Sequence, residues 1–168
     1  MSQGVDPTRR ALLRGRFRPQ AKVLPLPWAL PWTQFSAGCT RCDGCIKACP
    51  EQIIVRGEGG FPTLDFTRGE CTFCGQCVDA CNEPLFLPRT LSPWSLKAHI
   101  GSGCLAFGKV FCQSCQDACE LRAIRFRPVA GGIPTPSIEP ADCTGCGACV
   151  AGCPTQAITV ADPREERP

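Results

Sequence analysis

Apolar residues along this chain fall in short alternating runs, not in long helical repeats. Runs of this kind at 53–56, 62–65, 124–127 and 157–160 predict short strands. A pair of glycines follows the first and the third of these runs, as is typical of hairpin turns. One longer pattern, at 92–100, predicts a short helix. We therefore expect an α+β fold with little regular secondary structure and a small apolar core.

Cysteine accounts for 16 of the 168 residues, in four runs of four. Three of the runs have the spacing C-x2-C-x2-C-x3-C, and proline follows two of these directly. This pattern is the signature of cubane [4Fe–4S] sites. The third run is stretched, because seven residues separate its first two cysteines. In chain order the runs are Cys39, Cys42, Cys45, Cys49; Cys71, Cys74, Cys77, Cys81; Cys104, Cys112, Cys115, Cys119; and Cys143, Cys146, Cys149, Cys153.

The spacing suits a cluster because three cysteines in one tight loop can bind three irons of the same cube. The fourth lies on the helical turn that follows and points away, so in two-cluster modules it binds the neighbouring cluster. A disulfide framework is typical of secreted chains, and structural zinc takes two C-x2-C pairs with a spacer between them. Buried free thiols would not need regular spacing. Cluster binding is therefore the prediction for all four runs, with the stretched run the least regular.

The chain also repeats itself, which supports the stretched run as a ligand group. Moving the first half along by 70 residues superposes the last three cysteines of runs one and three, and moving it by 72 superposes runs two and four completely. Lys109 stands where the repeat would place the first cysteine of run three, and Cys104 lies five residues before it. We expect residues 105–111 to bulge as a loop that brings Cys104 to its cluster.

The repeat pairs run one with run two and run three with run four, giving two tandem ferredoxin-like modules of two [4Fe–4S] clusters each. Exchange of the fourth cysteines within a module then predicts four crossed ligand sets. They are set A (Cys39, Cys42, Cys45, Cys81), set B (Cys71, Cys74, Cys77, Cys49), set C (Cys104, Cys112, Cys115, Cys153) and set D (Cys143, Cys146, Cys149, Cys119).

The remaining segments divide the chain into five parts. A basic and Pro/Trp-rich segment precedes the cysteines, a proline-containing linker separates the modules, and a short charged tail ends the sequence. Residues 25–32 contain three prolines and two tryptophans and predict an extended strap, which either packs its rings on the modules or docks a partner. The predicted parts are 1–35, module one at 36–87, the linker 88–102, module two at 103–161, and 162–168.

Charge does not point to nucleic acid as a partner. The formal charge is +3, but four clusters at about −2 each would bring the loaded protein to about −5. Arg9 and Arg10 resemble a twin-arginine export signal, yet Arg14 and Pro19 interrupt the apolar stretch that such a signal needs. No segment has the length of a membrane span. We therefore expect a cytoplasmic protein without stable membrane insertion, in a compartment that keeps thiols reduced.

Four features together resemble the NapF family, the ferredoxin-type proteins encoded with periplasmic nitrate reductases. They are the basic motif at 9–16, the first cysteine run, the Arg-Gly-Glu-Gly-Gly-Phe-Pro turn at 56–62, and the stretched third run. The resemblance covers roughly 8–160. It implies a cytoplasmic accessory protein that acts on the precursor of the nitrate reductase catalytic subunit before export, in maturation or iron–sulfur cluster assembly.

Three functions stay open at this stage. A maturation factor would bind that precursor and carry a transferable cluster, with set C as the candidate for lability. A soluble polyferredoxin would instead pass electrons between redox enzymes, and a weaker alternative is a subunit of a membrane oxidoreductase. We do not expect an enzyme, because the sequence shows neither a nucleotide or flavin loop nor a catalytic triad.

Overall fold

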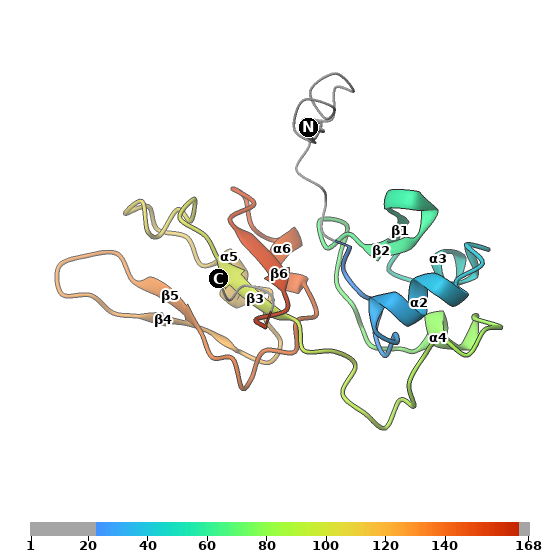
Figure 1. Ribbon diagram of the computed structural model, residues 1–168. Coiled ribbons are helices and arrows are strands. Elements are labelled where there is room, and N and C mark those ends of the chain that lie inside the picture. The colour runs from blue at the N-terminus through green and yellow to red at the C-terminus, as the bar shows by residue number, and fades with distance from the viewer. Residues whose placement is uncertain (1–22, 165–168) are drawn as a thin grey trace, which may run out of the picture.

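The computed structural model describes residues 23–164 as short helices and three two-stranded antiparallel sheets joined by long loops (Figure 1). The scarcity of regular secondary structure expected from the sequence is confirmed. The helices are α2 (Trp32–Gly38), α3 (Gly44–Ala48), α4 (Gln76–Asp79), α5 (Ser114–Asp117) and α6 (Ala148–Ala151), with a 3-10 turn, η1 (Glu58–Gly60). The strands are β1 (Ile54–Arg56), β2 (Pro62–Leu64), β3 (Lys97–Ile100), β4 (Ile124–Arg127), β5 (Thr135–Ile138) and β6 (Ile158–Ala161).

Two of the sheets are hairpins at equivalent places in the repeat. β1 pairs with β2, with Ile54 opposite Leu64, and β4 pairs with β5, with Ile124 opposite Ile138. The first hairpin turns at Gly59, whose φ of 65° lies in the left-handed region that glycine adopts without a Cβ clash. Strands predicted at 53–56, 62–65, 124–127 and 157–160 are confirmed to within a residue or two at their ends, whereas β5 was not predicted.

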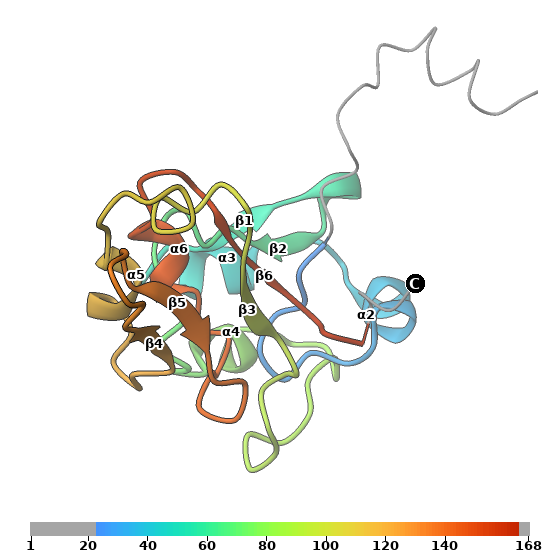
Figure 2. The ribbon, with the colours of Figure 1, turned by 90° about the vertical axis from the view of Figure 1, so that its left-hand side faces the viewer.

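The helix predicted at 92–100 is wrong, because this segment ends in the strand β3. β3 pairs with β6, so that Ile100 lies opposite Ile158 (Figure 2). The partner strand comes from about 60 residues further along the chain, and a local pattern carries no information on such a pairing. In the first module the equivalent contact is a single bridge between Ala29 and Phe86, and Ile158 lies 72 residues after Phe86. The internal repeat therefore extends to the strand pairings, since the Ala29–Phe86 bridge of the first module corresponds to the β3–β6 pairing of the second.

The strap at 25–32 packs on the first module through its first tryptophan. Trp28 is buried, its indole N–H donates to the Leu91 carbonyl at 2.8 Å, and its ring meets Phe73 edge to face. The prediction of an extended strap is wrong, because the chain turns at 27–28, where Trp28 has a φ of 60°, and Trp32, which is 46% exposed, begins helix α2. Of the two alternatives for the strap, packing of its rings on the modules thus holds for Trp28. The basic residues before Val23 and the end of the charged tail lie outside the described residues.

The apolar core is small and divides into two clusters. The larger contains Leu26, Ile53 and Phe66 of the first module together with Leu96 and Val160, which flank or belong to the β3–β6 sheet. The smaller cluster lies in the second module and includes two of its cysteines. No polar or charged side chain among residues 23–164 is buried. Since the apolar core is this small, metal–thiolate bonding is expected to supply much of the folding free energy.

We therefore predict that the metal-free protein is largely unfolded. Anaerobic removal of iron with a chelator should abolish most far-ultraviolet circular dichroism and any cooperative thermal transition, because the loops around the cysteines have little other stabilisation. Reconstitution with iron and sulfide should restore both signals. A metal-free protein that melts cooperatively with native-like dichroism would contradict the prediction.

Candidate metal centres

Three cavities in the described part of the chain are lined by cysteines, and each contains all four members of one crossed set, with Cys71 as a fifth cysteine in the cavity of set D. The cysteines of set A line a small cavity of about 20 Å³, and those of set B line another of about 20 Å³. The cysteines of set D line a larger cavity of about 330 Å³. Each cavity combines three cysteines of one run with the fourth cysteine of the paired run. The structure thus brings together the residues that the crossed sets require, while their role as ligands stays a prediction.

The crossing follows from the packing of the short helices. Helix α3 packs against α4, and α5 packs against α6. Cys45 lies within α3, whereas Cys49 follows the last helical residue in an extended conformation. The fourth cysteine was expected on the helix itself, but each helix ends before it. Because the chain leaves the helix at this point, the fourth cysteine reaches the cavity of the neighbouring run.

Burial makes several of these thiols hard to ionise in the metal-free protein. Desolvation is the main cause that raises the pKa of Cys45, Cys71 and Cys149 to about 12, and neighbouring thiols of the same module raise it further. The thiolate is the form that binds iron, so cluster binding must release these protons. Loading of the cavities is therefore favoured as the pH rises.

Set C gathers around the buried Cys115. Burial raises the pKa of Cys115 to about 11, and Cys104 is the first of the charged neighbours that raise it, followed by Cys112 and Cys153. Cys104 therefore lies close enough to Cys115 to affect its ionisation, although ten residues separate the two in the sequence. The other three cysteines of set C, Cys104, Cys112 and Cys153, thus all act electrostatically on Cys115.

Residues 105–111, here called the 105–111 loop, form the predicted bulge. The Cys104 carbonyl accepts the Gly108 N–H at 3.1 Å and the Leu105 carbonyl accepts the Val110 N–H at 2.9 Å, so the chain folds back on itself. Phe107 is 44% exposed and Phe111 is 65% exposed. The loop therefore carries Cys104 to set C and presents apolar side chains on the surface beside it.

The fourth cysteines of runs three and four have matching hydrogen bonds. Cys119 accepts the backbone N–H of Ala123 and Cys153 accepts that of Ala157, each at 3.3 Å. Burial acts to raise the pKa of Cys153, but this bond and those from Thr155 outweigh it, and the pKa is lowered. The N–H groups at Ala157 and Thr155 therefore stabilise the thiolate form of Cys153.

The cysteine groups fit [4Fe–4S] clusters better than single ions. Within residues 23–164, no three His, Cys, Asp or Glu side chains converge as the ligands of one metal ion do. The cysteines instead surround cavities with no competing histidine in their walls. Sets A to D would hold the clusters, which when bound supply one-electron chemistry at low to moderate potential.

Two residues outside the predicted sites also contribute to them. Glu70 and Phe73 belong to the second run's loop but line the cavity of set D in the other module. This contact arises from module packing, and nothing in the local sequence indicates it. His99 is exposed on β3. Among the described residues, no helix is long and apolar enough to cross a membrane.

The displaced ligand can be tested by removing it and by restoring regular spacing. Cys104→Ser should lower the iron content of anaerobically reconstituted protein from about sixteen to about twelve per chain, because one of four cubes loses a ligand. Adding Lys109→Cys to this variant should restore the lost iron, since position 109 is where the repeat expects the cysteine. Equal iron content in the wild type and in Cys104→Ser would contradict the assignment of Cys104 to set C.

Comparisons with known proteins agree with two modules of paired cysteine runs. Residues 38–85 and 110–157 each match a family described as "4Fe-4S dicluster domain". "Ferredoxin-type protein NapF" of Escherichia coli K12 is 46% identical over 155 residues, which cover 92% of this chain and 94% of that protein. The protein of the same name from Haemophilus influenzae is 44% identical over 92% of this chain and 93% of its own length.

A more distant relative is "Methylamine utilization ferredoxin-type protein MauM" of Methylobacillus flagellatus, 32% identical over 85% of this chain and 69% of that protein. No solved structure matches the chain. The names of these relatives describe ferredoxin-type proteins and not enzymes. With two dicluster domains, four cysteine groups and this similarity over nearly its whole length, the chain belongs to the NapF family of ferredoxin-type proteins.

Proposed function

We propose that this protein binds four [4Fe–4S] clusters through sets A to D. We further propose that it acts in the cytoplasm in maturation of the catalytic subunit of periplasmic nitrate reductase, before export of that subunit. Membership of the NapF family supports the link to the nitrate reductase system. The observation that carries the maturation role is the 105–111 loop, which separates Cys104 from the rest of run three and exposes apolar side chains.

Set C differs from the other sets in how its first cysteine is held. Cys104 follows a turn in which its N–H donates to the Gly101 carbonyl at 3.2 Å, and it lies outside the tight run that holds the other ligands. The equivalent first cysteines of the other runs lie three residues before the next cysteine. A ligand on a separate loop can leave the cluster without displacement of the other three. This arrangement suits a cluster that is released to another protein.

The surface beside set C suits contact with a partner. Phe107, Val110 and Phe111 of the 105–111 loop are 44%, 51% and 65% exposed. Exposed apolar side chains grouped on one loop are typical of protein interaction sites. Lys109 adds a positive charge to the same loop. We therefore place the contact with the unfilled precursor of the catalytic subunit at the 105–111 loop.

Electron carriage is the second candidate function. The specific observation that favours it is the crossed arrangement, which places two cysteine cavities close together within the first module. Clusters held in this way exchange single electrons readily. Under this function all four clusters stay bound through repeated reduction and oxidation, whereas the maturation role requires loss of iron from set C.

Cluster transfer distinguishes the two candidates. The protein should be loaded with radioactive iron and incubated without oxygen with the cluster-free precursor, then separated from it. We expect about four irons to move to the precursor and the remaining twelve to stay. Replacement of Phe107 and Phe111 by serine should weaken the complex by roughly tenfold or more, since each exposed aromatic anchor contributes on the order of 1 kcal/mol or more.

The control variant for this experiment is Leu91→Ser, which alters an apolar side chain of similar exposure (52%) far from set C in the sequence. Leu91→Ser should bind the precursor and transfer iron to it as the wild type does. If no iron moves and no complex forms at low salt, the maturation role is wrong. Stable retention of all iron together with rapid electron exchange would then favour the carrier function.

A further inference from the structure

The second and fourth cysteine runs touch across the boundary between the modules. The Cys71 N–H donates to the Cys146 carbonyl at 2.8 Å. Cys71 belongs to set B in the first module, and Cys146 belongs to set D in the second. One backbone hydrogen bond therefore joins two cysteines from different modules.

The cavity of set D is built partly from the first module. Its walls include Glu70, Cys71, Thr72 and Phe73 in addition to its own four cysteines. Glu70 and Cys71 also line the cavity of set B. The two cavities thus share a wall, which also includes Thr72 and Phe73.

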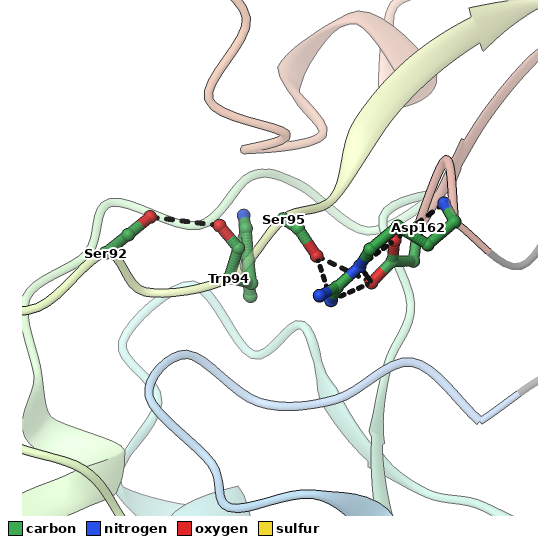
Figure 3. Close-up of polar contacts among 5 residues, drawn as sticks. Ser92, Trp94, Ser95 and Asp162 are labelled. Atoms are coloured by element: carbon green, nitrogen blue, oxygen red, sulfur yellow. Dashed lines mark hydrogen bonds and ion pairs between the residues drawn. The ribbon is translucent and has the colours of Figure 1, made fainter.

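Trp94 of the linker holds the two runs together. Its ring meets Phe73 of the second run at 5.3 Å and Phe66 at 6.3 Å, both edge to face. Its indole N–H donates to the carbonyl of Thr144 in the fourth run at 2.7 Å. Figure 3 shows how its segment is fixed in turn, since Ser95 donates to Asp162 beyond β6 at 2.6 Å. The linker therefore contacts both modules and holds the second run next to the fourth.

Two glycines allow this close approach. Gly147 has a φ of 89°, and a Cβ there would lie 2.0 Å from the Phe66 ring of the first module. Gly145 has a φ of 73°, and its Cβ would lie 2.3 Å from the Leu96 carbonyl oxygen. The fourth run is thus packed directly against Phe66 and the linker, with no room for larger residues.

We propose that the four centres form one continuous electron path in the order A, B, D, C, with the crossing between modules at the contact of Cys71 with Cys146. Centres held by set B and set D would exchange one electron across this contact, the centre of set B being oxidised and that of set D reduced. No proton or covalent bond takes part. A low-potential one-electron donor supplies the path at one end, and a one-electron acceptor takes up the electron at the other.

This inference rests on the cluster sites proposed above and not on the identity of the partner. Its consequence is that set C, beside the 105–111 loop, can receive electrons that enter at set A. Two modules that merely share a chain would provide no such route. Iron content tests whether the cluster sites exist, and magnetic coupling tests whether the centres of sets B and D are linked. Either proposal can therefore fail without the other.

The sharpest test leaves one centre in each module. Alanine at Cys39, Cys42, Cys104 and Cys112 removes sets A and C and should leave about eight irons, in sets B and D. The reduced protein should then give an EPR spectrum split or broadened by coupling between the two spins. The matched control has alanine at Cys71, Cys74, Cys143 and Cys146 and retains only sets A and C, so its spectrum should show two separate signals. Separate signals from the first variant at full iron content would overturn the proposal.

A single charge provides a second test, which leaves every cysteine in place. Because Glu70 lines the cavities of both set B and set D, Glu70→Gln should raise the reduction potentials of two of the four centres, since removal of a negative charge favours the reduced state. Glu83 lines the cavity of set A, so Glu83→Gln should raise one potential and serves as the control. If Glu70→Gln shifts only one reduction potential, or none, then Glu70 does not lie between two centres. The proposed electron path would then be wrong.

Discussion

The exchange of fourth cysteines between paired runs is the constraint on which the rest of this structure depends. Each run ends in a helix of about one turn, and the packing of α3 on α4 and of α5 on α6 directs the next cysteine into the neighbouring cavity. A cluster bound by such a set ties together two segments roughly 30 residues apart, as a covalent cross-link would. The apolar core is too small to fix these loops alone, so metal binding and folding are expected to form one equilibrium.

Much of the site could be predicted from the sequence because cluster ligation is local. The spacing of three cysteines within one loop determines which of them share a cube, and the repeat identifies the paired runs. The prediction of Cys104 as a ligand depends on the repeat, since Lys109 occupies the regular position. The features that could not be predicted depend on distant contacts. β3 forms because β6 offers a partner strand, and Glu70 reaches set D only because the modules pack against each other.

The linker has a larger role than its composition indicates. Its prolines predict a spacer between independent modules, but Leu96 is buried in the core cluster of the first module while β3 completes a sheet of the second. Trp94 contacts a cysteine run from each module. This packing gives the protein two distinct surfaces of interest. One is the internal contact between sets B and D, and the other is the 105–111 loop, where set C approaches the exterior beside exposed phenylalanines.

The central claim is that the ligand sets are crossed and that Cys104 completes the third of them. The most direct test is a crystal structure of the anaerobically reconstituted protein in which iron is located by anomalous scattering. The account predicts four iron centres, with Cys81 and Cys49 exchanged in the first module, Cys153 and Cys119 exchanged in the second, and Cys104 bound with Cys112 and Cys115. Centres bound by the four cysteines of a single run, or a third centre without Cys104, would contradict it.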